Sequence, residues 1–437
     1  MARKMLLYNK MKFNIYTLGC KVNSYDSEEI SENMQNHGFF LSKTGDEDVF
    51  IVNSCTVTAE SDRKTRQLVR RLRRSNVNAI IVLTGCMPQA FPNLGEELLE
   101  ADIVVGNHDN DKIPQYIDEF LRDRKRIFRV IPHIRNEKYS GGIIKNFEEH
   151  TRAFIKIQDG CDRFCSYCAI PYARGRSRSK PLEIVQNELD TIAKAGYKEV
   201  VFVGINLSFY GADFGLTLAS AVKSAENTDG IERIRLGSLE PDHIDESLLM
   251  ELSECRKFCP QFHISLQSGS DKILRKMNRH YTADEYAVLV ENIRIIFPDA
   301  AITTDIICGF PGETEDDFAE TVSFAQKIGF DKTHIFPYSR RPGTPADKLP
   351  EQISKQIKEE RCRNLAIVCE KSRLDFMQKM VGKTVNVLFE VPSDGIQRGY
   401  GENYLPVNVI SDEILTGKIL PVKIISVQND GLCGILV

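Results

Sequence analysis

The chain has 437 residues, of which 42% are hydrophobic and 27% charged, and it carries a formal net charge of -4. This length is too great for one compact core and predicts two or three domains of ordinary globular composition. The small net charge excludes binding to nucleic acid through bulk charge, so any such contact must use local basic patches.

We expect neither a membrane span nor a secretion signal in this sequence. No apolar run reaches the length of a transmembrane helix, and residues 1–8 have too short an apolar core for a signal peptide. We therefore expect a cytoplasmic protein that does not bind membranes. In that reducing compartment the twelve cysteines are expected to ligate metal or to be buried, rather than to form disulfide bonds.

Residues 11–120 are predicted to form an α/β domain built around a parallel sheet. Short apolar runs typical of buried parallel strands alternate there with segments of helical spacing. The expected strands are residues 13–18, 49–53, 79–84 and 103–105. The expected helices between them are residues 26–35 and 59–74.

Three cysteines of this segment each follow a predicted strand directly. They are Cys20, Cys55 and Cys86. Because the carboxyl ends of parallel strands lie along one edge of a sheet, these thiols are expected to converge in space. Three unrelated buried thiols are the alternative. The repeated surroundings Leu-Gly-Cys, Asn-Ser-Cys and Thr-Gly-Cys favour a shared cluster instead.

Residues 151–380 are predicted to form a second α/β domain, separated from the first by a charged linker at residues 121–150. The helices expected in it include residues 181–195, 283–296 and 358–380. Its six expected strands are residues 153–158, 199–204, 233–239, 262–266, 301–307 and 332–336. Six strand–helix units predict a partial (β/α)6 barrel, in which working groups lie on the loops that follow the strands.

A second set of thiols follows the first strand of this barrel, with the pattern Cys-x3-Cys-x2-Cys at Cys161, Cys165 and Cys168. Thiolates favour zinc, copper(I) or iron–sulfur clusters. Structural zinc normally has four closed ligands, and no further Cys or His completes this group nearby. A cubane cluster held by three cysteines instead keeps one iron open for a substrate or cofactor.

Residues 381–437 differ in character and are predicted to form a small β-barrel, a type often used for RNA. The expected strands are residues 384–389, 404–409, 418–425 and 432–437. Four basic residues stand here against six acidic ones, which is weak for an RNA clamp. Tyr400 and Tyr404 are candidates both for stacking on bases and for the barrel core.

Basic side chains are concentrated in two other places. The helical segment 59–74 contains Arg63, Lys64, Arg66, Arg70, Arg71, Arg73 and Arg74. The segment after the second thiol set contains Arg174, Arg176, Arg178 and Lys180. Both are candidate phosphate-binding patches that would give a salt-dependent affinity for RNA. For the helical segment, a solvated helix face is an equal alternative.

The remaining cysteines and the histidines give no metal-site pattern. Burial explains Cys255 and Cys259 better than half a zinc site does. His263, His280 and His334 show no metal-ligand spacing in the sequence. The other cysteines without a cluster pattern are Cys308, Cys362, Cys369 and Cys433.

The three-cysteine loop resembles the signature of the radical S-adenosylmethionine (SAM) enzymes. With the upstream thiols and the C-terminal barrel, nearly the whole chain resembles the methylthiotransferases, whose C-terminal barrel is of the TRAM type. This resemblance implies two [4Fe-4S] clusters, one on each set of three cysteines, and SAM as the cofactor. It also implies that one SAM methylates a sulfur on the auxiliary cluster and that a second SAM yields a radical. The radical removes a hydrogen from an unreactive carbon, and the methylthio group takes the place of that hydrogen.

Four polar residues on the loops of the predicted barrel are candidate SAM contacts. Asn206 resembles the family position that contacts the methionyl amine. Glu240 and Gln267 follow strands where polar groups would hold the ribose or the carboxylate, and Arg279 would neutralise the SAM carboxylate. For each of them, a loop residue satisfied by its own backbone is the alternative.

The stretches 17–23 and 171–179 resemble the branch of this family that acts on threonylcarbamoyladenosine in tRNA. The isopentenyladenosine branch typically has Gln-Met-Asn after the first cysteine, and the ribosomal-protein branch has Pro-Lys-Asn; this chain has Lys-Val-Asn. The implied partners are a tRNA anticodon stem-loop, a low-potential electron donor such as flavodoxin or ferredoxin, and a sulfur donor. The other two branches, and a zinc-dependent RNA-binding protein without catalysis, are the alternatives.

Overall fold

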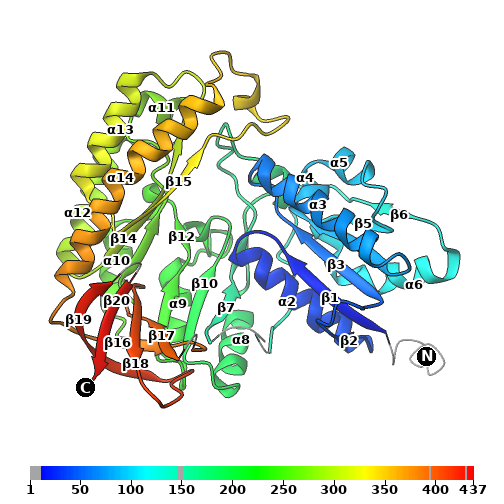
Figure 1. Cartoon of the computed structure of the whole chain (residues 1–437), viewed down its shortest axis with the longest axis horizontal. Coiled ribbons are helices and arrows are strands. Elements are labelled where there is room, and N and C mark those ends of the chain that lie inside the picture. Colours follow the sequence, from blue (N-terminus) through cyan, green and yellow to red (C-terminus); the bar gives the residue numbers. More distant parts are fainter. Residues whose placement is uncertain (1–10, 146, 148–150, 393–394, 429–430) are drawn as a thin grey trace. The chain divides into compact units, whose positions relative to one another are not determined.

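The computed structural model describes residues 11–145, 147, 151–392, 395–428 and 431–437 (Figure 1). The chain divides into two compact units. Unit 1 comprises Met1–Ile144, Gln158–Lys180 and Ser339–Asp347, and unit 2 comprises Lys145–Ile157, Pro181–Tyr338 and Lys348–Val437. Residues 1–8, considered above as a signal peptide, and the end of the predicted linker lie outside the described residues. No helix in the described ranges is long and apolar enough to cross a membrane.

Unit 1 is built on a six-stranded parallel sheet, which confirms the predicted fold class. Its strand order is β2-β1-β3-β4-β5-β6. The strands are β1 (Lys12–Thr17), β2 (Phe40–Leu41), β3 (Val49–Ser54), β4 (Ile80–Gly85), β5 (Ile103–Val105) and β6 (Ile127–Arg129). β2 is not predicted because two residues carry no periodic signal, and β6 is not predicted because its three residues, unlike the all-apolar β5, end on Arg129 in a charged stretch. β6 lies in the segment that the sequence predicts as a linker.

Helices cover both faces of this sheet, because the strands are apolar on both sides. On one face, α2 (Lys21–Asn36) and α6 (Ile113–Asp123) bury Ile30, Met34 and Ile117. On the other, α3 (Ala59–Ser75) buries Leu68, Val69 and Leu72. The Thr58 side chain caps α3 by accepting a hydrogen bond from Ser61 N–H. Short helices α4 (Cys86–Ala90), α5 (Pro92–Glu96) and α7 (Ile170–Arg174) complete the unit.

Unit 2 contains the predicted partial barrel, with its strands in two parallel sheets. The first sheet has the order β11-β10-β7 and the second β12-β13-β14-β15. The strands are β7 (Ala153–Lys156), β10 (Glu199–Val203), β11 (Arg233–Leu236), β12 (Ser238–Leu239), β13 (Gln261–Ile264), β14 (Ala301–Cys308) and β15 (Lys332–Pro337). The predicted strand 233–239 is therefore interrupted at Gly237. Six strand positions remain, which confirms the partial (β/α)6 barrel.

Helices follow these strands along the chain, as the βα pattern requires. They are α8 (Leu182–Lys194), α9 (Leu218–Glu226), α10 (Glu246–Ser253), α11 (Asp271–Lys276), α12 (Ala283–Ile296), α13 (Glu315–Ile328) and α14 (Lys355–Lys379). Capping boxes fix the starts of α12 at Thr282 and of α13 at Thr314. Two further short strands, β8 (Gln158–Asp159) and β9 (Arg178–Ser179), pair antiparallel in unit 1.

The C-terminal residues form the predicted small β-barrel within unit 2. It is closed in the order β16-β17-β18-β20-β19. The strands are β16 (Thr384–Phe389), β17 (Ile396–Tyr400), β18 (Pro406–Ile410), β19 (Ile419–Gln428) and β20 (Gly431–Leu436). β17 was missed because Gln397, Arg398 and Gly399 have low strand propensity. The core includes Val387, Phe389, Val407 and Val422.

A buried carboxylate in the partial barrel organises three arginines that bind the C-terminal barrel. Glu199 accepts from Arg235 at 2.8 Å and from Arg233 at 3.3 Å, and Arg152 lies nearby. Arg233 also donates to Tyr400 O at 3.1 Å, and Arg235 donates to backbone carbonyls of the same loop. The arginines therefore satisfy both the carboxylate and the carbonyls of the barrel loop.

Tyr400 and Tyr404 are packed where the three arginines meet the C-terminal barrel. The sequence alone does not decide whether these two side chains stack on bases or belong to the barrel core. Their rings stack on each other with centroids 4.8 Å apart. The Arg152 guanidinium lies 4.8 Å from the Tyr400 ring centroid and 5.0 Å from that of Tyr404. These cation–π contacts occupy the rings within unit 2.

Asp331 gives unit 2 a pH-dependent stability. It is buried before β15, and its carboxylate accepts a hydrogen bond from Ile302 N–H. Burial, partly offset by that bond and by Arg294, raises the pKa of Asp331 to about 7. The unfolded value is about 3.9, so the folded state binds more protons between these two values. This contribution to stability is full below pH ~4 and is lost as the pH rises through about 7.

Replacement of Asp331 by Asn is expected to remove this titration. The unfolding free energy of the variant, relative to the original chain, should rise by about 2.5 kcal/mol between pH 5 and pH 8. Urea denaturation at the two pH values measures this difference. A constant difference between the two proteins across this range would exclude Asp331 as the titrating group.

Candidate functional site

The three upstream thiols of unit 1 lie together around one side chain, Asn23. Cys20 directly precedes α2, Cys55 follows β3, and Cys86 begins α4 directly after β4. Asn23 Oδ1 lies 3.9 Å from Cys20 Sγ and 3.8 Å from Cys86 Sγ. Cys55 is close enough to both of the other thiols to interact with them electrostatically. The carboxyl ends of β1, β3 and β4 thus bring three thiols to one edge of the sheet.

Two glycines before these cysteines allow the strand ends to approach one another. A Cβ on Gly85, which has φ +96°, would meet Ser54 N and O at 2.5 Å. A Cβ on Gly19, with φ +132°, would meet Cys55 Cβ at 3.0 Å. The Gly-Cys pairs that the sequence repeats are therefore needed for close packing around the thiols.

The downstream thiols are held by a loop whose backbone points N–H groups at sulfur. Arg163 N–H donates to Cys161 Sγ at 3.5 Å, and Ile170 N–H donates to Cys168 Sγ at 3.4 Å. Both donors lie two residues after the cysteine. In the upstream set, Val57 N–H bonds Cys55 Sγ at 3.5 Å with the same offset. Such bonds stabilise thiolates and tune iron–sulfur clusters.

Arg174 links this loop to the upstream thiols, all within unit 1. Its Nη2 donates to Asn23 Oδ1 at 2.8 Å and to Asp26 Oδ2 at 2.7 Å. Its Nη1 lies 3.3 Å from Asp159 Oδ2, two residues before Cys161. The side chains of Arg174, Asp26 and Asp159 are only 2%, 4% and 9% exposed. A buried guanidinium therefore lies between the segments that carry the two thiol sets.

The electrostatic surroundings disfavour free thiolates in the upstream set. Burial raises the pKa of the Cys86 thiol to about 12 and also raises the pKa of Cys55. The positive charge of Arg174 acts in the opposite direction on both. Coordination to a metal deprotonates a thiol outright, so a cluster would pair its negative charge with the buried arginine.

The donor type of the thiols fits iron–sulfur clusters, because thiolates are the ligands that hold them. A cubane distributes its cysteine ligands over several irons. The sets Cys20/Cys55/Cys86 and Cys161/Cys165/Cys168 are therefore suited to one such cluster each.

The basic segment after the loop is not the phosphate-binding patch that the sequence predicts. Arg174, Arg178 and Lys180 are buried, and only Arg176 is substantially exposed. Arg178 donates to Arg174 O at 2.6 Å, and Lys180 donates to the Tyr25 hydroxyl at 3.0 Å. The buried residues use their charges inside unit 1, so this prediction is wrong for three of the four residues.

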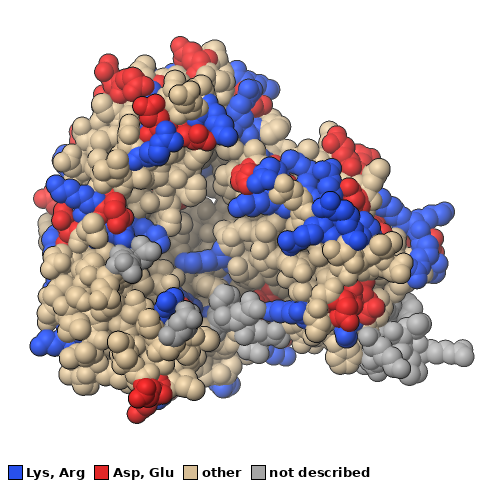
Figure 2. All heavy atoms as spheres, viewed as in Figure 1, with Lys and Arg blue, Asp and Glu red and all other residues tan. Residues whose placement is uncertain are grey.

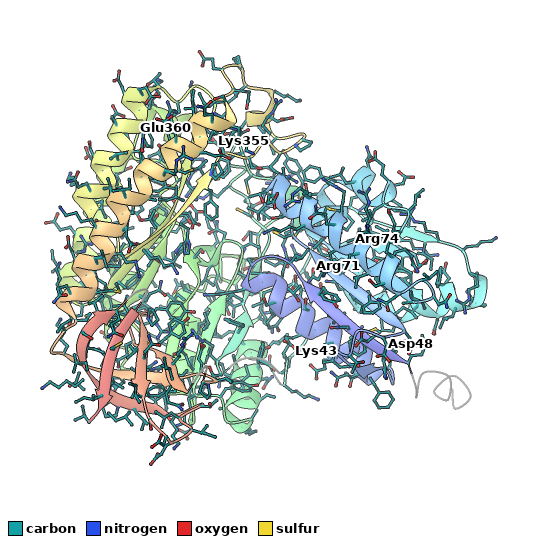
Figure 3. All side chains as sticks on the ribbon, in the orientation of Figure 1. Lys43, Asp48, Arg71, Arg74, Lys355 and Glu360 are labelled. Atoms are coloured by element: carbon teal, nitrogen blue, oxygen red, sulfur yellow. The ribbon has the colours of Figure 1, made fainter. Side chains whose placement is uncertain are left out.

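The other basic segment, on α3, does present charge to solvent. Figure 2 shows basic side chains gathered over this helix, and Figure 3 labels Arg71 and Arg74 along it. Arg63, Arg70 and Arg73 are paired with Glu60, Glu100 and Asp102. The part of the chain that the structure describes contains no ion pair to the remaining four, Lys64, Arg66, Arg71 and Arg74. A groove beside α3 is lined by Lys64, Arg71 and Arg74 together with Tyr16.

The candidate SAM contacts all lie in unit 2, and two of them bind each other. Arg279 Nη2 lies 2.5 Å from Glu240 Oε2, and Arg279 Nε donates to the Tyr281 hydroxyl at 2.9 Å. Asn206 is buried after β10, next to the turn Leu207–Phe209. Gln267 has a left-handed φ of +69°, a conformation that strains a non-glycine residue and is found at functional sites.

Two further sites have no clear signal in the sequence. Arg341 lies 279 positions from Asp62 in the chain, yet its buried guanidinium bonds that carboxylate at 2.6 Å within unit 1. His263 and His334 meet at Asp305, although the sequence shows no metal-ligand spacing for them. The histidines are brought together by strand register, and Arg341 by a distant segment of the chain that folds into unit 1. The spacing of residues in the sequence reveals neither.

Two family profiles match separate segments of the chain, and each segment contains one of the two thiol sets. The profile of the Radical SAM superfamily matches residues 155–325. The profile of a family described as uncharacterized protein family UPF0004 matches residues 12–106. The first contains Cys161, Cys165 and Cys168, and the second contains the upstream thiols.

Among solved structures, the chain is similar to TsrM, a radical S-adenosylmethionine methyltransferase from Kitasatospora setae. The TM-score is 0.58 at 14% sequence identity, over 89% of this chain and 80% of that one. At this identity the likeness concerns the fold, and it extends across both units.

Three relatives are similar over most of their length. The threonylcarbamoyladenosine tRNA methylthiotransferase MtaB of Thermotoga maritima is 37% identical over 96% of this chain and 95% of its own. MtaB of Aquifex aeolicus is 40% identical over 86% and 92%. The tRNA-2-methylthio-N(6)-dimethylallyladenosine synthase of Pelotomaculum thermopropionicum is 36% identical over 97% of both chains. The chain therefore belongs to the tRNA methylthiotransferase family of radical-SAM enzymes.

Proposed function

We propose that this enzyme converts N6-threonylcarbamoyladenosine next to the tRNA anticodon to its 2-methylthio derivative. The observation that carries the proposal is the pair of three-thiol sets joined in one unit through Arg174. The Cys-Lys-Val-Asn context at Cys20 and the names of the MtaB relatives support this nucleoside. Isopentenyladenosine in tRNA is the second candidate, because a relative at 36% identity is named for its dimethylallyl form. A ribosomal protein is the third.

The proposed cofactors are two [4Fe-4S] clusters and SAM. Cys161, Cys165 and Cys168 would hold the cluster that binds SAM, and Cys20, Cys55 and Cys86 the auxiliary cluster. When bound, these groups supply radical chemistry and a sulfur for transfer. The chain's own part is to orient them: backbone N–H groups bond the sulfurs, and Arg174 and Asn23 place charge and an amide beside the auxiliary set.

For SAM itself, we propose that Asn206, Glu240 and Gln267 provide the polar contacts, and that the fourth candidate, Arg279, acts through Glu240. The Glu240–Arg279 pair modifies their expected roles. Because Arg279 already bonds Glu240, a SAM carboxylate would have to compete for that guanidinium, and Glu240 is held in a fixed orientation. We therefore assign Arg279 the role of positioning Glu240, which would accept from the ribose hydroxyls.

The exposed part of α3 is proposed to bind tRNA phosphates. Replacing Arg71 and Arg74 together by Gln is expected to weaken tRNA binding about tenfold at ~0.1 M salt, and to reduce the slope of log K against log salt by about two. Filter binding over a range of salt concentrations measures both. The matched control replaces two exposed basic residues of unit 1, Lys125 and Arg135, and should leave the slope unchanged. An unchanged slope for the α3 variant would show that these charges only face solvent and do not contact tRNA phosphates.

The remaining partners follow from the proposed chemistry. A low-potential donor such as flavodoxin or ferredoxin would reduce the SAM-binding cluster, and a sulfur donor would renew the auxiliary cluster after each turnover. We place the enzyme in the cytoplasm, because its proposed substrate is tRNA. The family membership and the radical-SAM fold support this location.

Mass spectrometry of tRNA nucleosides tests the substrate. The chain is expressed in a bacterial host that lacks its own methylthiotransferases, and digested tRNA is compared with that of the host alone. The expected product is the 2-methylthio derivative of threonylcarbamoyladenosine. Appearance of the isopentenyladenosine derivative instead would replace the proposed substrate by the second candidate. Unchanged tRNA with a methylthio group on a ribosomal protein would replace it by the third.

A further inference from the structure

Three potential metal ligands from neighbouring strands meet on one face of the second sheet of unit 2. His263 is on β13, Asp305 on β14 and His334 on β15. A ligand atom of each lies within 4.8 Å of the other two. The strand register causes this meeting, because Asp305 pairs directly with His334, and His263 pairs with Thr303 on the same strand as Asp305.

These side chains face away from the helices that cover the sheet. Cys369 of α14 lies against Thr333, so His334, the next residue, points to the opposite face. On β14, Thr304 and Ile306 are fully buried, whereas the Asp305 side chain between them is 28% exposed. His334 is exposed. An ion therefore reaches the three ligands from solvent without any rearrangement of the core.

A contact with Thr303 holds the His263 ring in place. Thr303 Oγ1 accepts a hydrogen bond from Gln261 Nε2 at 3.2 Å, and His263 Nδ1 lies 2.9 Å from the same oxygen. The other ring nitrogen, Nε2, lies 3.3 Å from Asp305 Oδ2.

Two electron-rich atoms at this distance require positive charge between them, either a proton on Nε2 or a metal ion. The His334 ring, whose centroid lies 5.8 Å from that of His263, adds a second imidazole at the same point. A histidine whose other ring nitrogen is held by a hydrogen bond is the usual arrangement in metal sites. We infer that His263, Asp305 and His334 bind one divalent first-row transition-metal ion.

The donor set defines the class of ion and what it does. Two imidazoles and one carboxylate suit Zn²⁺, Fe²⁺, Co²⁺ or Mn²⁺ rather than Ca²⁺ or Mg²⁺. Three protein ligands leave coordination positions open for water or for an oxygen of a bound molecule. This ion is additional to the two clusters of the proposed function, and its ligands include no cysteine.

Manganese binding by the cluster-loaded enzyme tests the inference. The clusters occupy the six cysteines of the two thiol sets, and oxidised [4Fe-4S] clusters give no electron paramagnetic resonance, so the loss of the free Mn²⁺ signal counts the ions bound. We expect one Mn²⁺ per chain, displaced by Zn²⁺, which binds such ligands more tightly. Asp305→Asn and His334→Ala should weaken binding at least about 100-fold, and Thr303→Val about tenfold, because it frees the His263 ring.

The control is His37→Ala, which removes an exposed histidine of unit 1 and should bind Mn²⁺ as the original chain does. Cluster content and circular dichroism establish that each variant is folded; Asp305→Asn is the variant that preserves side-chain shape. Absence of saturable Mn²⁺ binding, or equal binding by the original chain and Asp305→Asn, would show that a proton alone joins His263 to Asp305 and would overturn the inference.

Discussion

Replacement of Arg174 by Met is expected to destabilise unit 1 by about 3–5 kcal/mol, because it removes a buried guanidinium from the buried carboxylates of Asp26 and Asp159, of which Asp159 still pairs with Arg178 at 3.4 Å. Arg174 pairs with Asp26 at 2.7 Å and with Asp159 at 3.3 Å, and all three side chains are less than a tenth exposed. Urea denaturation of the metal-free chain under reducing conditions measures the loss. The same variant should also lose iron from the auxiliary set, since no buried guanidinium would remain beside Asn23 to balance the negative charge of a cluster on these thiols.

The matched control lies two residues further along the same segment. Arg176 pairs with Asp162 at 3.0 Å, but both side chains are more than 40% exposed. Such a pair contributes about 0–1 kcal/mol, so Arg176→Met should change stability little. If the two variants lost similar stability, the buried network would not be the link between the thiol segments.

Replacement of Cys86 by Ala is expected to abolish methylthio transfer while retaining reductive cleavage of SAM. Cys86 belongs to the upstream set and is fully buried at the start of α4. Its loss removes one ligand from the proposed auxiliary cluster and leaves Cys161, Cys165 and Cys168 intact. Chromatography with mass spectrometry measures 5′-deoxyadenosine and the modified nucleoside in one reaction.

Two further variants serve as controls for this result. Cys161→Ala should abolish both products, because SAM binding requires an iron held by that loop. Cys433→Ala, in the C-terminal barrel, should retain both, since that thiol bonds only Gln428 among the described contacts. Normal methylthio transfer by Cys86→Ala would exclude the upstream thiols from the reaction.

Much of the fold could be predicted because it depends on local patterns. Long strands such as β3, β4 and β14 are apolar runs bounded by turns, and the structure places them within one or two residues of the prediction. The very short strands β2 and β6 could not be found, since their pairing with the sheet rather than their composition makes them strands. The same holds for the break at Gly237, which divides the barrel strands between two sheets.

The candidate site was predictable only as far as its cysteines. Their position after strands and the Cys-x3-Cys-x2-Cys spacing are local features. Whether a charged side chain faces solvent depends on partners far away in the chain, so the local sequence predicts Arg174 as part of a surface patch. Its partner Asp26 lies 148 positions upstream. His263, Asp305 and His334 likewise come together only through strand register.

Iron and sulfide analysis after anaerobic reconstitution tests most directly that this chain holds two clusters. We expect about eight irons and eight sulfides per chain, and about four of each after Cys20, Cys55 and Cys86 are all replaced by Ala. About four irons in the original chain, with no loss on that triple replacement, would contradict a second cluster on the upstream thiols.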